Sequence, residues 1–196
     1  MVNSYDMKNY LITSLLFLSL GFSQKEYNYN DIIEMNNGLW TEKFSEKPIS
    51  GNVYITFGEK DNLKKVYFGN LLNGEKDGRW TIWFENGRRS SEGTYKDGKQ
   101  DGLTTLWYEN GQKKSEINYK KGKYDGLWTN WDENGKKSSE RTLNNGEMDG
   151  LQTTWYENGL KKSEINYKKG KLISYKYWNE DGSVNKEWNE DGSVKN

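Results

Sequence analysis

The segment GLTTLWYENGQKKSEINYKKGKYD, residues 102–125, contains the pattern that decides the fold. Near-copies stand before and after it, and corresponding glycines and tryptophans are 24 residues apart each time. Self-similarity at a fixed period of this length indicates a repeat protein built from one supersecondary unit. The glycines that open the repeats are Gly78, Gly102, Gly126 and Gly150, and the Glu-Asn-Gly triplets end at Gly87, Gly111, Gly135 and Gly159.

Each repeat is predicted to be a strand, a tight turn and a returning strand. Residues 103–108 are rich in Thr, Leu and aromatic side chains, and residues 113–119 follow on the other side of the turn. The Asn-Gly pair between them is typical of a type I′ hairpin turn. Frequent glycines leave no stretch long enough for an amphipathic helix. The sequence therefore predicts an all-β fold, a tandem β-hairpin repeat array that forms an elongated, twisted antiparallel sheet.

The amino-acid composition argues against catalysis. The 196 residues include no cysteine and no histidine, which removes thiolate nucleophiles, imidazole bases and the usual zinc ligands. Carboxylates recur in the Glu-Asn-Gly and Asp-Gly turns, but a group repeated identically along an array is interpreted as structural, with Asp satisfying backbone N–H groups. We therefore expect no enzyme activity, no catalytic residue, no metal and no cofactor.

The chain divides into four parts. Residues 1–23 resemble a cleavable signal peptide, with Lys8 ahead of the apolar run YLITSLLFLSL, so we expect an exported protein that is periplasmic, cell-surface or secreted. Residues 24–50 are a lead-in segment, and residues 174–196 are interpreted as a capping hairpin and tail. The repeat array covers residues 51–173, in units 51–77, 78–101, 102–125, 126–149 and 150–173.

Alternation along the strands predicts one face that is constant between repeats and one that varies. The constant side carries a tryptophan row, which we interpret as core packed between repeats. A scaffold needs sequence differences where it makes specific contacts, so the variable aromatic residues are the candidate binding face. The structural positions are Trp83, Trp107, Trp131 and Trp155 with the four Glu-Asn-Gly glycines, and the binding candidates are Trp80, Phe84, Tyr108, Trp128 and Tyr156.

The order Asp-Gly, one or two aromatic residues, Glu-Asn-Gly, Lys-Lys-Ser-Glu, Tyr-Lys, Gly-Lys resembles the MORN-repeat variant found in bacterial proteins. The resemblance covers residues 51–173, and bacterial chains of this composition are often classed with the YwqK-family antitoxins. It implies a β-hairpin array that serves as a protein-interaction scaffold and, in some members, neutralises a toxin. MORN repeats elsewhere are linked to phospholipid headgroups, which leaves peripheral membrane contact open.

Two functions follow as hypotheses. In the first, an exported, non-catalytic scaffold binds another protein, such as a toxin or an envelope component. In the second, exposed aromatic side chains bind cell-wall polysaccharide or another glycan. Nucleic acid is not expected as a partner, because 29 basic side chains balance 29 acidic ones and glutamates flank the Lys and Arg pairs.

Overall fold

The computed structural model describes residues 24–57, 64–189 and 194–195, and the expected signal peptide, residues 1–23, lies outside them. None of these residues belongs to a helix with the length and apolar character that crossing a bilayer requires. One 3-10 helix, η1 (Tyr29–Asp31), lies near the start. The strands are β1 (Glu26–Asn28), β2 (Ile32–Glu34), β3 (Trp40–Glu42), β4 (Gly51–Phe57), β5 (Lys64–Leu72), β6 (Glu75–Trp83), β7 (Arg89–Lys96), β8 (Lys99–Trp107), β9 (Lys113–Lys120), β10 (Lys123–Trp131), β11 (Lys137–Asn144), β12 (Glu147–Trp155), β13 (Lys161–Lys168), β14 (Lys171–Trp178), β15 (Val184–Asn189) and β16 (Val194–Lys195).

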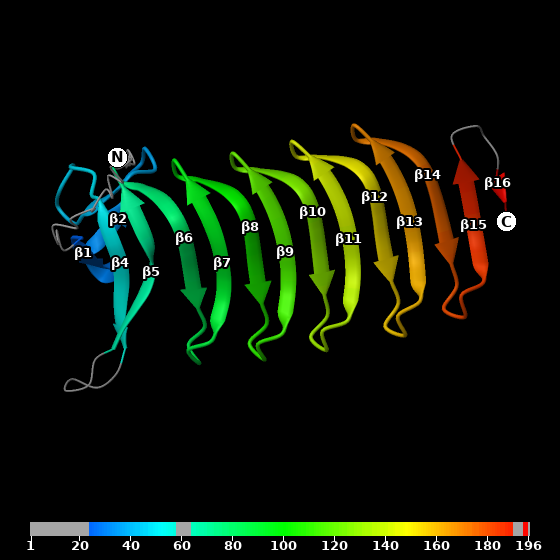
Figure 1. The fold of residues 1–196 in the computed structure, drawn as a ribbon, viewed down its shortest axis with the longest axis horizontal. Coiled ribbons are helices and arrows are strands. Elements are labelled where there is room, and N and C mark those ends of the chain that lie inside the picture. The colour runs from blue at the N-terminus through cyan, green and yellow to red at the C-terminus, as the bar shows by residue number, and fades with distance from the viewer. Residues whose placement is uncertain (1–23, 58–63, 190–193, 196) are drawn as a thin grey trace, which may run out of the picture.

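Fourteen of the described strands join into one open sheet, in which neighbours along the chain are neighbours in space (Figure 1). From β4 to β16 the strand order follows the sequence, and consecutive strands are antiparallel. β1 instead pairs in parallel with β4, and β2 and β3 form a separate two-stranded sheet. The prediction of an all-β array of tandem hairpins in an elongated sheet is confirmed.

Each 24-residue repeat contributes one hairpin. In one repeat β8 and β9 pair, with Thr105 opposite Glu116, and in the next β10 and β11 pair in the same way, with Thr129 opposite Glu140. β9 also pairs with β10, so a backbone ladder joins successive repeats as well as the two strands of one hairpin. Because an isolated hairpin is marginal in water, this pairing between repeats stabilises each unit.

The Glu-Asn-Gly turns are not the type I′ turns predicted for them. The amide of Tyr108 donates to the carbonyl of Gln112, and the amide of Gly111 donates to the carbonyl of Tyr108, each over 2.9 Å. Within this loop positive φ is confined to Gly111, at 91°. The arrangement is a three-residue loop, in which a type I turn is followed by a left-handed glycine. Gly87, Gly135 and Gly159 are left-handed in the same way.

In three of the four turns the asparagine ties neighbouring repeats together, which explains why the turn prediction is wrong. Asn110 Oδ1 accepts from the amide of Gln112 over 2.8 Å. Asn110 Nδ2 donates over 2.8 Å to the carbonyl of Glu133, in the turn of the next repeat. Asn86 and Asn158 make the corresponding contacts. Asparagine is therefore present for a contact between repeats and not for a left-handed backbone.

Type I′ turns occur at the opposite ends of the hairpins, where one repeat passes to the next. Lys121 and Gly122 both have positive φ, 50° and 81° respectively, as this turn type requires. The amide of Gly122 donates to the carbonyl of Gln100 in the preceding hairpin over 2.7 Å. The other left-handed pairs are Asn73-Gly74, Asp97-Gly98, Asn145-Gly146 and Lys169-Gly170.

Lys121→Asn is expected to stabilise the fold. Asparagine tolerates the left-handed region better than lysine does, so we expect a gain of about 0.5 kcal/mol in the free energy of unfolding. A urea titration would show it as a higher midpoint with an unchanged slope. Gln112→Asn, at a residue without positive φ, is the control and should give no gain. Equal midpoints for Lys121→Asn and the parent protein would contradict the assigned turn type.

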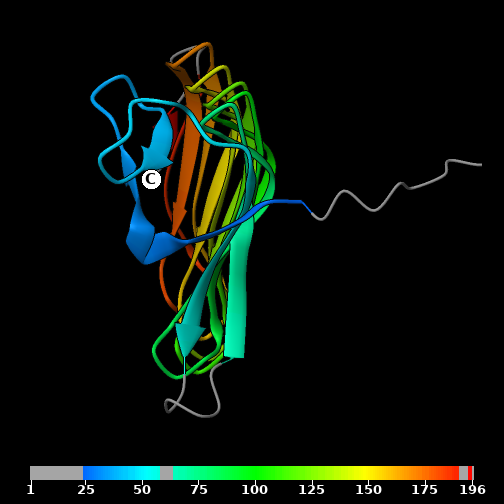
Figure 2. The same ribbon diagram turned by 90° about the vertical axis from the view of Figure 1, so that its left-hand side faces the viewer.

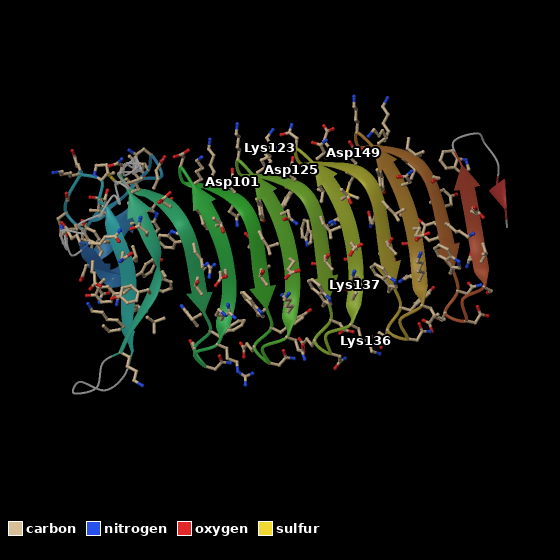
Figure 3. The ribbon with its side chains drawn as sticks, in the orientation of Figure 1. Asp101, Lys123, Asp125, Lys136, Lys137 and Asp149 are labelled. Carbon is tan, nitrogen blue, oxygen red and sulfur yellow. The ribbon has the colours of Figure 1, made fainter. Side chains whose placement is uncertain are left out.

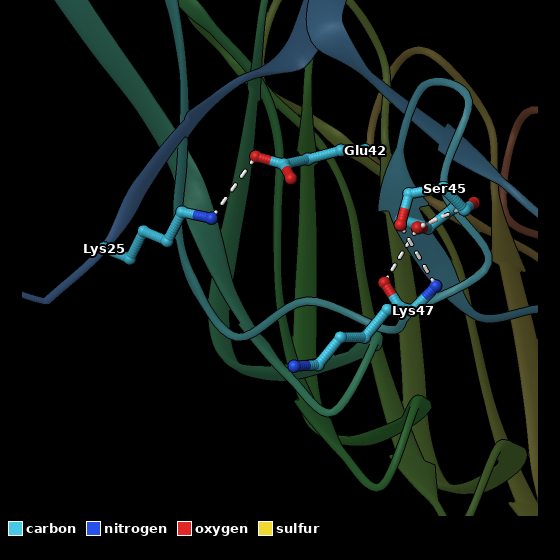
Figure 4. A network of polar contacts seen from close by, with 5 residues as sticks. Lys25, Glu42, Ser45 and Lys47 are labelled. Carbon is cyan, nitrogen blue, oxygen red and sulfur yellow. Dashed lines mark hydrogen bonds and ion pairs between the residues drawn. The ribbon is translucent and has the colours of Figure 1, made fainter.

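Residues 24–50, which we call the cap, fold over one face of the sheet at its N-terminal end (Figure 2). Within the cap, Lys25 Nζ lies 3.3 Å from Glu42 Oε1, and the amide of Lys47 donates to Ser45 Oγ over 3.2 Å (Figure 4). The main hydrophobic cluster of the described residues joins the cap to the array, so the core lies at one end of the molecule. Its buried members are Tyr27, Ile32, Ile49, Val53, Leu71 and Trp80.

Two indole rings replace part of the backbone ladder between β5 and β6. These strands pair at three positions, from Asn70 with Asp77 to Leu72 with Glu75. Beyond them, Trp80 Nε1 donates to the carbonyl of Asn70 over 2.9 Å, and Trp83 Nε1 lies 3.5 Å from a second carbonyl of β5. The ring of Trp80 covers Gly69, where an added Cβ would come within 2.6 Å of the indole.

Gly69→Ala is expected to destabilise the protein by about 1–3 kcal/mol, because the new methyl group forces the indole of Trp80 out of the core. Urea unfolding would measure this loss. Gly93→Ala is the matched control, since its Cβ would meet the hydroxyl of Thr104 at 2.8 Å, and one hydroxyl gives way more easily than a buried ring. A smaller loss for Gly69→Ala than for Gly93→Ala would contradict this account of the junction.

Candidate binding site

The strand register separates two faces of the array. Thr129 lies opposite Glu140, whereas its neighbour Trp128 lies opposite Arg141 and points to the other side of the sheet. We call the side of Thr129 the constant face and the side of Trp128 the variable face. Successive repeats place Thr81, Thr105, Thr129 and Thr153 on the constant face, and Trp80, Thr104, Trp128 and Gln152 on the variable face.

The tryptophans of the constant face are half-buried, not enclosed as core. The guanidinium of Arg89 lies 4.7 Å from the ring centre of Trp107, and Lys113 Nζ lies 5.9 Å from that of Trp131, so each ring is covered by a cation of the preceding repeat. The same lysine forms an ion pair with Glu116. The expected burial of the row, Trp83, Trp107, Trp131 and Trp155, is not reached, because the described residues place no second layer over this face.

The variable face carries a cluster that we call the aromatic–arginine patch: Tyr119, Tyr124, Trp128 and Arg141. The rings of Tyr124 and Trp128 stack with their centres 5.0 Å apart and an angle of 27° between their planes. The ring centre of Tyr119, the residue opposite Tyr124 on β9, lies 5.0 Å from that of Tyr124. The guanidinium carbon of Arg141 lies 3.6 Å from the ring centre of Trp128. Tyr124 is 37% exposed, so the patch is accessible to a partner.

Hydrogen bonds hold Trp128 in one orientation. Its Nε1 donates to Ser115 Oγ and to Asn130 Oδ1, both at 2.9 Å. Asn130 Nδ2 in turn donates to Ser139 Oγ over 2.9 Å, which connects the indole to the next strand. A ring that is fixed before binding loses little conformational entropy when a partner packs on it. The predicted binding candidate Trp128 is therefore well placed for recognition.

The other predicted binding residues lie elsewhere. Trp80 is 7% exposed, and the cap buries it within the hydrophobic cluster, so it cannot contact a partner in this structure. Phe84, Tyr108 and Tyr156 do not continue the variable face, because the strands end at the tryptophan before each of them and these residues begin the Glu-Asn-Gly turns. The hydroxyl of Tyr108 donates to the carbonyl of Trp131 over 2.9 Å, so this side chain links neighbouring repeats.

These three aromatic residues line two open clefts at the Glu-Asn-Gly edge of the sheet. Phe84 and Tyr108 line a cleft of about 510 Å³, and Tyr156 lines one of about 660 Å³. Equivalent tryptophans and lysines of the two clefts are 48 residues apart, which is two repeats. Trp107, Lys114 and Glu133 also line the first cleft, and Trp155, Lys136, Lys162 and Glu180 belong to the second.

Sequence reasoning missed Tyr119, Tyr124 and Arg141 as binding residues. The signal for Arg141 was present, since the corresponding residue is Gly93, Ile117 or Ile165 in the other repeats. Finding it requires the pairing register of the returning strand, because only the register shows that Arg141 shares a face with Trp128. Comparison of one strand between repeats does not show which residues of the neighbouring strand share its face.

The recurring aspartates have a structural role. Asp125 Oδ2 accepts from the amide of Asn145 over 3.1 Å, and Asp101 Oδ2 accepts from the amide of Lys121 over 3.2 Å. Figure 3 shows Asp101, Asp125 and Asp149 along the edge of the sheet that carries the type I′ turns. No group of three or more Asp and Glu residues within the described part of the chain could hold a metal ion.

These features define a single-layer array of β-hairpin repeats with an N-terminal cap. Four segments match the MORN repeat variant, residues 76–97, 100–121, 124–145 and 148–169, and each covers one hairpin. MORN repeats are generally modules for interaction with proteins or membranes. No curated protein sequence matches this chain.

A crystal structure of TarM is similar to this chain over part of its length. The match has 12% sequence identity and a TM-score of 0.33, and it covers 59% of this chain and 20% of that protein.

The patch makes a prediction about alkaline pH. Burial, and then the neighbouring Tyr124, raise the pKa of Tyr119 from 10.0 to about 12. The unfolded chain releases this proton first, so the contribution of Tyr119 to stability is full below pH 10 and is lost as the pH rises toward 12. Tyr119→Phe should therefore make the fall in unfolding free energy across this range shallower, as measured by urea titrations at successive pH values. Parallel curves for the two proteins would contradict the shift.

Proposed function

We propose that the protein is an exported, non-catalytic scaffold that binds another protein through the variable face. The observation that carries this proposal is the aromatic–arginine patch. It combines an ordered indole, an exposed tyrosine and an arginine, which are the residue types enriched at the energetic centres of protein interfaces. Tyr124 and Arg141 have no counterpart of the same residue type in the other repeats, so the combination occurs at one place on the array.

The constant face supports this division of roles. Four cations there each pair with a glutamate of their own strand and lie over a tryptophan of the following hairpin: Arg89, Lys113, Lys137 and Lys161. Such contacts maintain the array and repeat without change, so they offer a partner no distinctive position. Export, which rests on the signal-like residues 1–23, would bring the variable face to envelope or extracellular proteins.

The most specific form of this function is toxin neutralisation, which the resemblance to the YwqK-family antitoxins suggests. A toxin would bind to the variable face, and this contact would cover its active surface. Co-expression with each toxic protein encoded beside this chain tests the idea directly. Restored growth with the parent protein, lost on Tyr124→Ala, would support it, whereas a failure to restore growth with any of them would contradict this form.

Glycan binding is the second candidate function, and the two clefts at the Glu-Asn-Gly edge favour it. Each cleft combines a tryptophan, a tyrosine and charged side chains, and aromatic rings provide surfaces against which sugar rings can stack. Tyr108 contributes to one cleft while its hydroxyl is engaged in the fold. A glycan would therefore bind at the edge of the sheet, away from the aromatic–arginine patch.

Affinity capture with face-specific variants should show which surface binds. We expect the purified protein to retain one stoichiometric protein from exported and envelope fractions, identified by mass spectrometry. Tyr124→Ala should reduce its recovery at least tenfold, because it removes the exposed ring of the patch. Leu127→Ala is the matched control, since Leu127 lies on the same strand, faces the other side and is 43% exposed against 37% for Tyr124.

Three outcomes would contradict the proposal. Equal recovery with both variants would place the contact away from the variable face. Recovery of wall polymer without protein, lost on Tyr108→Ala, would favour the glycan clefts. Capture of nothing at micromolar concentration by a folded protein, as judged by circular dichroism, would remove the scaffold function altogether.

A further inference from the structure

Among the described residues, Arg141 differs from the other arginines in having neither an ion pair nor a side-chain hydrogen bond. Arg79 and Arg89 each form an ion pair with Glu92, and Arg88 donates to a backbone carbonyl over 3.0 Å. Across the described residues Arg141 forms no ion pair, and its Nε is the buried side-chain nitrogen that lacks a hydrogen-bond partner. A buried N–H without an acceptor destabilises the free protein, so an acceptor brought by a ligand would relieve that cost.

The guanidinium of Arg141 also packs on an ordered indole and is partly desolvated. It lies 3.6 Å from the centre of the Trp128 ring, whose own orientation is set by Ser115 and Asn130. Burial lowers the pKa of Arg141, which is the expected effect of removing water from a cation. Part of the desolvation that binding an anion requires has therefore already occurred.

The two faces differ in how their cations are neutralised. Cations over the constant-face tryptophans are paired with glutamates, as Lys113 is with Glu116. Three cations over aromatic rings of the variable face form no ion pair among the described residues: Lys76 over Trp80, Arg141 over Trp128 and Lys186 over Tyr175. The glutamates of the returning strands instead lie opposite constant-face threonines, as Glu92, Glu116, Glu140 and Glu164 show. Aromatic rings and positive charge together complement a segment that is apolar and acidic.

The cap shows which types of side chain pack on an aromatic–cation pair of this face. Lys76 Nζ lies 4.9 Å from the ring centre of Trp80, and cap strand β2 packs Ile32 into the same cluster. Burial lowers the pKa of Lys76. The negative charge of Glu34, two residues after Ile32 on β2, opposes this shift. Residues two apart on a strand point to the same side, so one extended segment supplies both an apolar group and a carboxylate.

We infer that the aromatic–arginine patch is a carboxylate-binding site that recognises an extended, acidic segment of the partner protein. An apolar side chain of that segment packs on Trp128 and Tyr124, and its carboxylate accepts hydrogen bonds from Arg141 Nε and one terminal nitrogen. A guanidinium fork matches a carboxylate in this bidentate geometry. Because Nε is covered in the free protein, the guanidinium pivots on the indole to present this edge. The inference rests on the proposed use of the variable face.

Nitrogen-15 NMR of the arginine Nε–Hε groups tests the site. The chain has four arginines, and the signal lost in Arg141→Lys identifies Arg141. The probe is a synthetic peptide with the cap sequence YNDIIEM, residues 29–35. We expect a saturable shift of the Arg141 signal, an affinity at least tenfold lower with Arg141→Gln, and at least fivefold weaker binding of the D31N/E34Q peptide. Arg79→Gln, on the constant face, is the control and should leave the affinity unchanged.

Other results would overturn the inference. These are equal binding of the acidic and neutral peptides, equal shifts at Arg79 and Arg141, or a shift with inorganic phosphate but none with the acidic peptide. Circular dichroism of Arg141→Lys and Arg141→Gln checks that both variants fold. If affinity capture finds a protein partner on the variable face while the peptide leaves Arg141 unchanged, the carboxylate site is wrong and the scaffold function stands. Peptide binding to Arg141 without a captured protein would support the carboxylate site and contradict the scaffold function.

Discussion

The backbone ladder between one hairpin and the next is the interaction on which the rest of the structure depends. A hairpin of 24 residues has no core of its own, and the described sheet is a single layer beyond the cap. Stability therefore comes from contacts along the sheet, not from contacts across it. Lysines over tryptophans, asparagines that reach the next turn and tyrosines that reach the next strand all join one repeat to its neighbour.

This constraint explains why the faces differ in character. On the constant face, contacts between repeats must recur in every unit, so the same threonine, glutamate and tryptophan return each time. The variable face has no such requirement, because the ladder forms whatever its side chains are. Its positions accept Thr104 in one repeat and Trp128 in the next without a change of register. Because its side chains are not needed to join the repeats, this face is suitable for specific recognition.

The sequence contained most of the fold and part of the candidate site. The period and the hairpins follow from spacing, because glycine and aromatic positions recur at fixed intervals. The turn types do not follow, since Asn110 is selected by a contact with the next repeat and Lys121 adopts a left-handed backbone without a sequence signal. Likewise, Trp80 and Trp128 occupy equivalent positions, and only the cap, which shows no periodicity, buries the first and leaves the second accessible.

Each hydrogen bond that links neighbouring turns spans about one period, as from Asn110 to Glu133, and points toward the C-terminal neighbour. A duplication or deletion of one whole repeat would leave every such contact with an equivalent partner. The number of repeats can therefore change in evolution without redesign of any interface. Because the ladder advances by two strands per unit, each added repeat would move the outlying part of the array by about 10 Å relative to the cap. The number of repeats would then set the distance between two contacts with a large partner.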